Sequence, residues 1–539
     1  MHLTRIAVEN HSRLANLELK VRQHMVLVGP NDVGKSSLLR CLHLLLGAST
    51  AQLYSQIDIE DFRDRDKPFL VEADIAGFDG DEHGLFRALF PDEIKVDGES
   101  WWLTIRLEAS FDSSETLSVN RYAPHGRTGR QLSREQLQAI GWRFLGATDG
   151  LRNLQENRRS LLDDLLNTID LGDEKESFKE LNEQVIGRLR DSAVLTGLRE
   201  ELSGQLTRAL PEKIDTDQLQ FAPGSSIGDD MLDGVQLQVL KDGKPHLVTD
   251  QSDGMRAMYA VAMYDLISGA ANMVAIDEPE IHLHPTSQRS LASLLKNGRN
   301  QKILATHSPD IVGAFPPECI VSVRPGGKVV QPKSSDFLND DDRVVLRWWN
   351  HDKLEPLTSN KIIIVEGVTD RNVLVRAAYL LEKDLDRLGV SIVTLEGSGE
   401  LTAVLKLFSN QGFNLPIYIL IDDDAKKDAA KALGVNLSRL EDSHVSVSVK
   451  DLEDEYTRAI GAKRLWELIK KSGKFTKNLL EKTIDSRDSS ALTDDKVAAF
   501  CRYKRNKATT SLIVAEALDR EMASKIESIR KILGWLEDR

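Results

Sequence analysis

The chain of 539 residues is poor in cysteine and in aromatic residues, and it contains no long apolar segment. Its three cysteines, Cys41, Cys319 and Cys501, are far apart, which excludes a disulfide framework and a cysteine zinc site. No stretch approaches the roughly 18 apolar residues of a membrane-spanning helix. The first residues also lack the cationic start and apolar core of a signal peptide. We therefore expect a cytoplasmic protein with no membrane partner.

Negative charge predominates, because the chain has 84 acidic residues and only 70 lysines and arginines, which gives a net charge of −14. Such a chain can bind nucleic acid only through a local basic patch. The length predicts about two to four domains.

Hydrophobic periodicity divides the chain into four segments. Residues 1–150 and 213–340 alternate strands with helices and polar loops, and we expect them to form one interrupted domain. Residues 151–212 carry apolar residues at helical spacing, which predicts an inserted helical hairpin. Residues 341–539 begin with a polar linker and continue, from residue 361, as strands alternating with helices, a pattern typical of a parallel sheet. A lysine-rich helical tail follows.

The segment "GPNDVGKSS" (29–37) follows an apolar strand and opens a helix, which is the context of a phosphate-binding loop. Its glycines allow backbone N–H groups to approach phosphate, and Lys35 would reach the β and γ phosphates. The Ser36 hydroxyl would bind Mg²⁺. The predicted nucleotide contacts are Gly29, Asn31, Gly34, Lys35, Ser36 and Ser37.

Two further strands end on residues that suit nucleotide hydrolysis. "NMVAIDEPE" (272–280) ends a strand on Asp277, a predicted Mg²⁺ ligand, and on Glu278, a predicted general base for the attacking water. "KILATHSP" ends another strand at His307, which we expect to contact the γ-phosphate. Together with the phosphate-binding loop, these residues predict an ATPase.

The segment "DQSDGMRAM" (250–258) resembles the signature motif of ABC-type ATPases, with Ser252 and Gly254 at the matching positions. The resemblance implies an ABC-type ATPase head whose nucleotide site is completed by the signature of another subunit. We therefore expect a homo-oligomer, a dimer or larger, formed through the ATPase heads and the helical insert.

Carboxylates also end two strands in the last segment. Glu366 follows "KIIIV", and Asp422 and Asp424 follow "PIYILI". Because parallel strands end at one edge of a sheet, these acids should share a crevice. Carboxylate oxygens are the ligands that Mg²⁺ prefers, and a metal held there could assist hydrolysis of a phosphodiester.

A strand ending in Glu-Gly, followed by one ending in Asp-x-Asp, resembles the TOPRIM fold of topoisomerases, primases and nucleases. An ABC-type ATPase followed by TOPRIM resembles the overcoming-lysogenisation-defect (OLD) family of nucleases. The resemblance implies further acidic ligands, for which Asp370 and Glu453 are the matching positions. It also implies a catalytic lysine, for which "RYKRNKATT" offers Lys504 and Lys507, and we favour Lys507.

The sequence thus predicts an α/β protein, with an ABC-type P-loop ATPase head, an inserted helical dimerisation hairpin and a C-terminal TOPRIM (Rossmann-like) domain with a helical tail. The function indicated is a metal-dependent DNA endonuclease that uses ATP and Mg²⁺, or Mn²⁺ or Ca²⁺ at the nuclease site, in bacterial defence against phage. An operon-encoded defence partner is a further expectation. Two alternatives stay open, a topoisomerase-like transesterase and an ATP-driven DNA-binding scaffold with an inactive TOPRIM domain. A third, a primase-like polymerase, would be expected to carry a zinc-binding module, which the three scattered cysteines do not provide.

Overall fold

The computed structural model divides into two compact units, Met1–Val329 and Val330–Arg539, each described here by itself. The domain boundary predicted near residue 340 and most of the insert predicted at 151–212 lie outside the described residues. Among the helices in the described part of the chain, none is long and apolar enough to cross a membrane. The structure describes residues 1–90, 102–112, 116–126, 131–147, 184, 187–209, 214–222, 236–241, 244–267, 271–332, 349–395, 397, 400–483 and 492–537.

An antiparallel sheet begins the first unit, with strand order β2-β1-β4-β5-β6. Strands β4 and β5 pair antiparallel, with Phe69 opposite Ala109 and Ala76 opposite Trp102. Side chains alternate along β4 between buried and half-buried, so one face of the sheet contributes to the core. The strands are β1 (His2–Glu9), β2 (Leu17–Lys20), β4 (Phe69–Ala76), β5 (Trp102–Phe111) and β6 (Leu117–Tyr122).

A second sheet carries the nucleotide motifs and has the order β14-β13-β3-β12-β11-β7. Its pairs β13–β3, β3–β12, β12–β11 and β11–β7 are parallel, so these strands end at one edge. The central strands consist of buried side chains throughout, as a sheet covered on both faces requires. The strands are β3 (Met25–Val28), β7 (Trp142–Leu145), β11 (Met273–Asp277), β12 (Gln301–Thr306), β13 (Ile320–Arg324) and β14 (Lys328–Val330).

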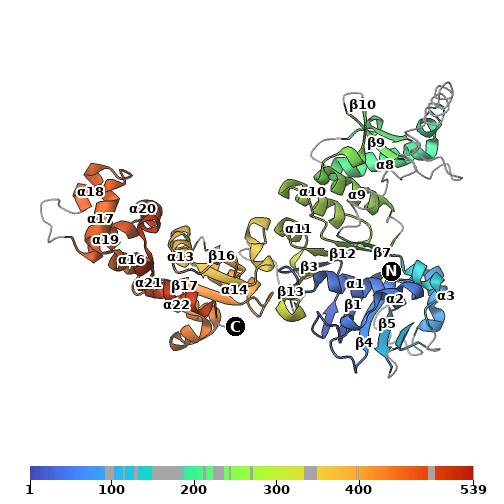
Figure 1. The fold of residues 1–539 in the computed structure, drawn as a ribbon, viewed down its shortest axis with the longest axis horizontal. Helices are drawn as coiled ribbons and strands as arrows, with labels where there is room; N and C mark the ends of the chain where they lie inside the picture. The colour runs from blue at the N-terminus through green and yellow to red at the C-terminus, as the bar shows by residue number, and fades with distance from the viewer. Residues whose placement is uncertain are drawn as a thin grey trace, which may run out of the picture. The chain divides into compact units, whose positions relative to one another are not determined.

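Helices cover both faces of this parallel sheet. Helix α1 lies between it and the antiparallel sheet, whereas α9, α10 and α11 lie on the opposite side (Figure 1). Helix α8 packs against α9 and α10 and falls within the segment predicted as the insert. A small antiparallel sheet, β10-β9-β8, adjoins α8. The bounds are α1 (Lys35–Leu46), α2 (Thr50–Gln56), α3 (Gly80–Phe86), α4 (Arg134–Ile140), α8 (Ala193–Ala209), α9 (Asp253–Ile267), α10 (Pro285–Lys296), α11 (Pro309–Ala314), β8 (Leu219–Ala222), β9 (Gln236–Lys241) and β10 (Lys244–Leu247).

The second unit contains a four-stranded parallel sheet of order β16-β15-β17-β18, as the strand–helix alternation predicted. The register pairs Val365 with Leu420, so β15 and β17 end side by side. The strands are β15 (Lys361–Val365), β16 (Val390–Thr394), β17 (Ile417–Ile421) and β18 (Val445–Val447).

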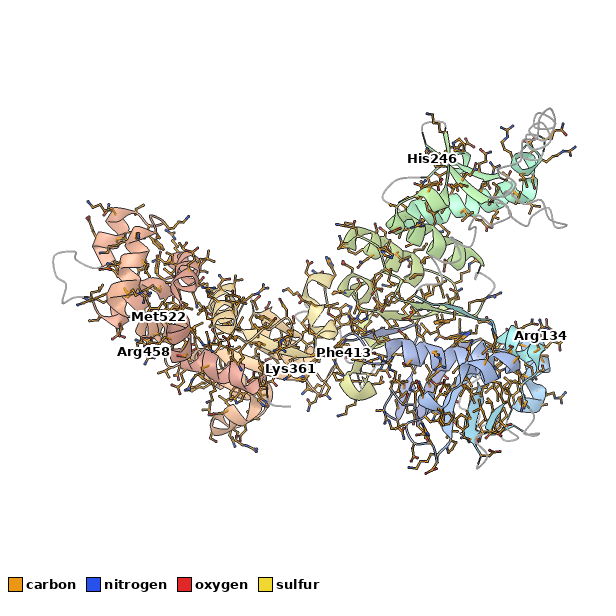
Figure 2. All side chains as sticks on the ribbon, in the orientation of Figure 1. Arg134, His246, Lys361, Phe413, Arg458 and Met522 are labelled. Carbon is orange, nitrogen blue, oxygen red and sulfur yellow. The ribbon has the colours of Figure 1, made fainter. Side chains whose placement is uncertain are left out.

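One face of this sheet and the C-terminal helices share a hydrophobic core. Ile363 and Leu420 from the sheet join Leu374 of α13, Tyr456 of α16 and Val514 of α20. Side chains fill this interior, and Figure 2 marks Lys361 at the start of β15 and Arg458 and Met522 on the neighbouring helices α16 and α21. The helices are α13 (Val368–Leu380), α14 (Glu400–Phe408), α15 (Lys426–Leu433), α16 (Leu452–Ile460), α17 (Ala462–Lys471), α18 (Lys477–Thr483), α19 (Asp494–Arg502), α20 (Lys504–Ala517), α21 (Arg520–Lys525) and α22 (Glu527–Trp535).

Candidate functional site

The loop between β3 and α1 depends on two glycines. A Cβ at Gly29 would lie 2.0 Å from the carbonyl oxygen of Val323, so only glycine fits beside β13. Gly34 has a φ of 107° and precedes α1, and a Cβ there would lie 2.8 Å from Leu14 Cδ2. The loop therefore brings its backbone and the N-terminus of α1 to one point, as anion binding requires.

Lys35 is buried inside this loop. Its Nζ donates to the carbonyl oxygens of Gly29 at 3.0 Å and Pro30 at 2.7 Å, and lies 3.3 Å from His307 Nδ1. Burial lowers the pKa of Lys35 to about 8, although the charges of Glu278, Asp277 and Glu280 oppose the shift. A bound phosphate would supply the counter-charge that the buried ammonium lacks.

Asp277 lies at the end of β11 and accepts a hydrogen bond from the Ser36 hydroxyl at 3.1 Å. Burial raises the pKa of Asp277, and the neighbouring Glu278 raises it further. A hydroxyl and a carboxylate at this spacing, beside a phosphate-binding loop, suit a Mg²⁺–nucleotide complex.

Glu278 and His307 form a pair beside the same loop. Glu278 Oε1 lies 3.3 Å from His307 Nε2, and Glu278 has a φ of 48°, a strained value for a residue with a Cβ. Because β12 lies between β3 and β11, His307 stands between Lys35 and Glu278. Burial lowers the pKa of His307, as does the Lys35 charge, which keeps the ring neutral.

Glu280, which no sequence motif singled out, holds the His307 segment in place. Its Oε1 accepts hydrogen bonds from Thr306 Oγ1 at 2.7 Å and from the His307 backbone N–H at 2.5 Å. The third acid of "DEPE" was the available signal, but the pattern could not reveal a contact between the ends of two strands.

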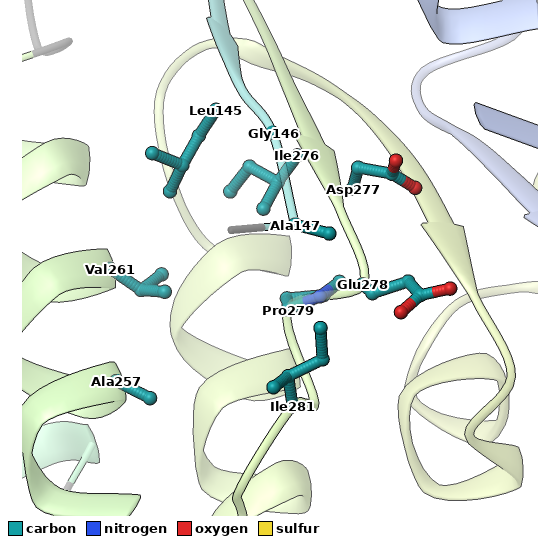
Figure 3. A pocket seen from close by; sticks show the side chains of 10 residues that line it. All are labelled: Leu145, Gly146, Ala147, Ala257, Val261, Ile276, Asp277, Glu278, Pro279 and Ile281. Carbon is teal, nitrogen blue, oxygen red and sulfur yellow. The ribbon is translucent and has the colours of Figure 1, made fainter. Parts of the chain in front are cut away.

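An apolar pocket adjoins these acids (Figure 3). Val261 and Ala257 of α9 face Ile276 across it, and the carboxylates of Asp277 and Glu278 point away from α9. Packing on that side therefore leaves both carboxylates directed toward the phosphate-binding loop. The pocket is lined by Leu145, Gly146, Ala147, Ala257, Val261, Ile276, Asp277, Glu278, Pro279 and Ile281.

The segment that resembles a signature motif lies at the start of α9. Ser252 is exposed, and a Cβ at Gly254 would lie 2.7 Å from the His282 carbonyl oxygen. This glycine thus allows α9 to approach the loop that follows β11. Asn31 is also exposed, and Ser37 is half-buried in the first turn of α1.

In the second unit, three carboxylates converge where β15 and β17 end. One oxygen each of Glu366, Asp422 and Asp424 lies within 4.8 Å of the others. Glu366 Oε1 accepts from the Asp422 N–H at 2.8 Å, and Asp422 Oδ1 accepts from the Leu452 N–H at 3.0 Å. The backbone of one strand end thereby orients the acid of its neighbour.

A second group of charged side chains lies beside the first. Lys507 Nζ lies 3.2 Å from Glu453 Oε1 and 3.9 Å from Asp370 Oδ1. Asp370 also accepts from the Gly367 N–H at 2.9 Å. Glu453 is buried, and its Oε2 has no hydrogen-bond partner among the described residues.

Burial and mutual repulsion make this acidic cluster costly without a cation. Burial, together with repulsion from Glu366, Asp370 and Glu453, raises the pKa of Asp422 to about 8. Burial likewise raises the pKa values of those three acids. Closely spaced oxygen ligands, with the unpartnered Glu453 oxygen beside them, fit a divalent cation such as Mg²⁺.

Burial alone would lower the pKa of Lys507, but Asp370, Glu453 and Asp422 outweigh it and raise this pKa to about 12. In the metal-free protein Lys507 is therefore positively charged. Helix α20 is held beside α13 by the hydrogen bond from Asn372 Nδ2 to Ser511 Oγ at 3.2 Å. This contact, which the sequence did not reveal, positions the lysine.

Residues 25–313 match the family described as "AAA domain, putative AbiEii toxin, Type IV TA system", and residues 357–424 match "Overcoming lysogenization defect protein-like, TOPRIM domain". A curated relative, "OLD nuclease" of Thermus scotoductus, is 24% identical over 451 residues, which are 78% of this chain and 82% of the relative. "Endonuclease GajA" of Bacillus cereus is 20% identical over 414 residues, covering 72% of this chain and 68% of GajA.

Two solved structures are also similar to parts of this chain. The C-terminal region of the Burkholderia pseudomallei OLD protein is 22% identical in sequence and has a TM-score of 0.28. The match covers 33% of this chain and 98% of the chain in that structure. An SmcHead bound to the C-winged helix domain of ScpA is 17% identical, covers 62% of this chain and 99% of its own, and has a TM-score of 0.40.

The raised pKa of Asp422 predicts a pH-dependent stability. Between its ordinary pKa of 3.8 and the folded value of about 8, the metal-free folded state binds more protons than the unfolded state. The stability of metal-free protein should therefore fall as pH rises through this window. Thermal unfolding in EDTA, from about pH 5 to pH 8.5, should show a flatter dependence for Asp422→Asn than for the wild type. Equal slopes for the two proteins would contradict this assignment.

Proposed function

Because the chain belongs to the family "AAA domain, putative AbiEii toxin, Type IV TA system" and carries an OLD-like TOPRIM domain, we propose that it is an ATP-hydrolysing, metal-dependent DNA endonuclease of bacterial defence against phage. The observation that carries this proposal is the convergence of Glu366, Asp422 and Asp424 within 4.8 Å at adjacent strand ends. Two relatives named as nucleases, matched over most of their length, support it.

In this proposal, Glu366, Asp422 and Asp424 hold one divalent cation, and Asp370 and Glu453 contribute ligands to a second. A bound divalent metal supplies an activated water and a Lewis acid for phosphodiester hydrolysis. Lys507 carries a fixed positive charge between Glu453 and Asp370. That charge would stabilise the negative charge that develops on the phosphate during hydrolysis.

At the ATP site, Lys35 binds the β and γ phosphates, while Ser36 and Asp277 hold Mg²⁺. Glu278 accepts the proton of the attacking water. His307 contacts the γ-phosphate, and its hydrogen bond to Glu278 orients the base. Glu280 acts as a positioning residue because it holds the backbone of His307.

The two alternatives receive less support. A topoisomerase-like transesterase needs a nucleophilic tyrosine in a DNA-cleaving domain, which the sequence does not indicate. A scaffold with an inactive TOPRIM domain would have no need for an acid cluster that destabilises the metal-free fold. Plasmid incubated with Mn²⁺ distinguishes the three, since a nuclease yields nicked or linear DNA, a topoisomerase relaxed closed circles, and a scaffold unchanged supercoils.

The proposed assembly is a head-to-tail dimer or larger homo-oligomer. Each ATP site would be completed by Ser252 and Gly254 of another subunit, and residues 151–212 would add a further interface. The exposure of Ser252 at the start of α9 supports this role. An operon-encoded defence protein is the further partner that we propose.

Asp422→Ala and Glu366→Ala should each reduce plasmid cleavage by more than about 100-fold, because each removes a direct metal ligand. ATP hydrolysis should persist, which reports an intact first unit. Asp423→Ala is the matched control, since Asp423 lies in the same turn but pairs with Lys426. Cleavage by either test variant at the rate of this control would exclude the TOPRIM centre as the nuclease.

Lys35→Ala should abolish nucleotide binding, because the phosphates lose their buried cation. Glu278→Gln should bind ATP but hydrolyse it at least about 100-fold more slowly, because an amide cannot accept the proton. Calorimetry and phosphate release measure the two effects. Glu60→Gln, an exposed glutamate of the same unit, serves as the control. If Glu278→Gln hydrolysed ATP at the wild-type rate, Glu278 would not be the general base.

Glu278→Gln should dimerise through its heads when Mg²⁺–ATP is added, because bound nucleotide then persists between the signature and the phosphate-binding loop. Adding Ser252→Arg should block this association, since a large cation would occupy the nucleotide-facing position. Light scattering measures the mass with and without ATP. If Ser252→Arg left the ATP-dependent increase unchanged, the signature would not complete the site.

A further inference from the structure

Positive charge is concentrated on α17 and the residues around it. From Arg458 to Lys477 the chain has seven basic residues and one acidic residue, Glu467, a net charge of +6 in a chain whose total is −14. The seven are Arg458, Lys463, Arg464, Lys470, Lys471, Lys474 and Lys477.

Four of these lysines have exposed side chains that pair with no carboxylate among the described residues. In the described part of the chain, no carboxylate pairs with Lys463, Lys470, Lys471 or Lys474. By contrast, Lys525 binds Glu521 at 2.7 Å and Lys531 binds Glu441 at 2.5 Å on α21 and α22. The unpaired lysines therefore form a positive surface, not a network of internal ion pairs.

The opposite side of α17 fixes this helix to the domain. Leu465, Trp466 and Ile469 are buried at helical spacing. The Trp466 ring lies 5.1 Å from the Phe500 ring of α19, and the Phe475 ring lies 5.1 Å from Phe500 as well. Helices α17, α19 and α20 accordingly lie side by side (Figure 1).

Phe500 connects this surface to the metal centre. Its carbonyl oxygen accepts a hydrogen bond at 3.0 Å from Asn506, which follows the corner between α19 and α20. At that corner Tyr503 is 57% exposed, and Lys504 and Arg505 are exposed beside it. Lys504 lies one helical turn before Lys507, whose ammonium reaches into the acid cluster.

An ion pair also ties the corner to α16. Arg502 forms an ion pair with Asp451, the residue that caps α16 by accepting from the Asp454 N–H at 2.8 Å. Helix α16 carries Glu453, so the exposed residues of the corner have a fixed place relative to the metal ligands. A fixed array of cations beside a phosphodiester-cleaving centre suits a phosphate backbone better than a small anion.

We propose that the cationic surface of α17, the turn at Lys474 and the corner at Tyr503–Arg505 binds the phosphate backbone of duplex DNA that enters the metal centre. This inference rests on the proposed nuclease function and names the surface that presents the substrate. It also supplies the local basic patch that an acidic chain needs in order to bind DNA.

The test measures binding of a fluorescent DNA duplex by anisotropy at several salt concentrations. The full chain carries Asp422→Ala in every case, so that the DNA stays intact in Mg²⁺. One variant adds Lys470→Gln, Lys471→Gln and Lys474→Gln, and a second adds Lys504→Gln and Arg505→Gln. The matched control adds Lys525→Gln, Arg530→Gln and Lys531→Gln, which removes the same charge as the first variant from another face.

The first variant should bind DNA at least about 10-fold more weakly at 0.1 M salt. The slope of the logarithm of its binding constant against the logarithm of the salt concentration should be smaller in magnitude by up to about 2.7, because each of three phosphate contacts contributes about 0.9. The second variant should lose up to about 1.8 of the slope. The control should match its parent. ATP hydrolysis should be unchanged in all of them, which reports an intact first unit, and an unchanged helical circular-dichroism signal and thermal unfolding should verify that the second unit is folded.

If both variants bound DNA as tightly as the control, the inference would be overturned. An acidic protein would then be the better candidate ligand for this surface. A wrong assignment of the nuclease function can be distinguished from a wrong assignment of this surface, because the unsubstituted protein would then leave plasmid uncut in Mn²⁺. Cleavage by the unsubstituted protein, with DNA affinity insensitive to these lysines, would reject only the surface.

Discussion

The repulsion among buried carboxylates at the ends of β15 and β17 is the constraint on which the second unit depends. Folding alone places one carboxylate oxygen each of Glu366, Asp422 and Asp424 within 4.8 Å of the others, and burial together with repulsion from neighbouring acids raises the pKa of Asp422 to about 8. Such a cluster persists only because strand pairing, backbone N–H donors and the packed helices hold it. Lys507 offsets part of the repulsion, and a divalent cation would offset the rest.

Both units place charged residues at the ends of parallel strands, but the pKa of the lysine is shifted in opposite directions in the two units. In each, strands that are adjacent in a parallel sheet end in polar residues, so acids and a lysine meet at one edge. Lys35 has a pKa lowered to about 8 by burial, whereas nearby acids raise the pKa of Lys507 to about 12. Lys35 thus gains its full counter-charge only when phosphate binds, but Lys507 is charged in advance.

Charge is also distributed to match these sites. The whole chain is acidic, with a net charge of −14, yet Arg458–Lys477 carries +6 next to the helices that hold Glu453 and Lys507. Repulsion from most of the surface and attraction to one face would direct a polyanion toward that face. Phe500 packs against Trp466 and Phe475 of the Arg458–Lys477 segment, and its carbonyl oxygen accepts a hydrogen bond from Asn506 on α20, the helix that carries Lys507.

The sequence by itself determined the elements that depend on local pattern. The phosphate-binding loop, the strands ending at Asp277, Glu366 and Asp422, and the parallel arrangement of the second unit all follow from periodicity and from residues next in the chain. Asp370, Glu453 and Lys507 were assigned only through family resemblance, because helices carry them and no local pattern says which helix face meets a strand end.

Only the tertiary structure brought Glu453 on α16 and Lys507 on α20 to 3.2 Å from each other, across more than fifty residues of chain. It likewise revealed Glu280 beneath His307, and Phe500 between α17 and the corner of α20. The physical reason is that such contacts arise from helix packing and strand order, which depend on the whole core and not on neighbouring residues.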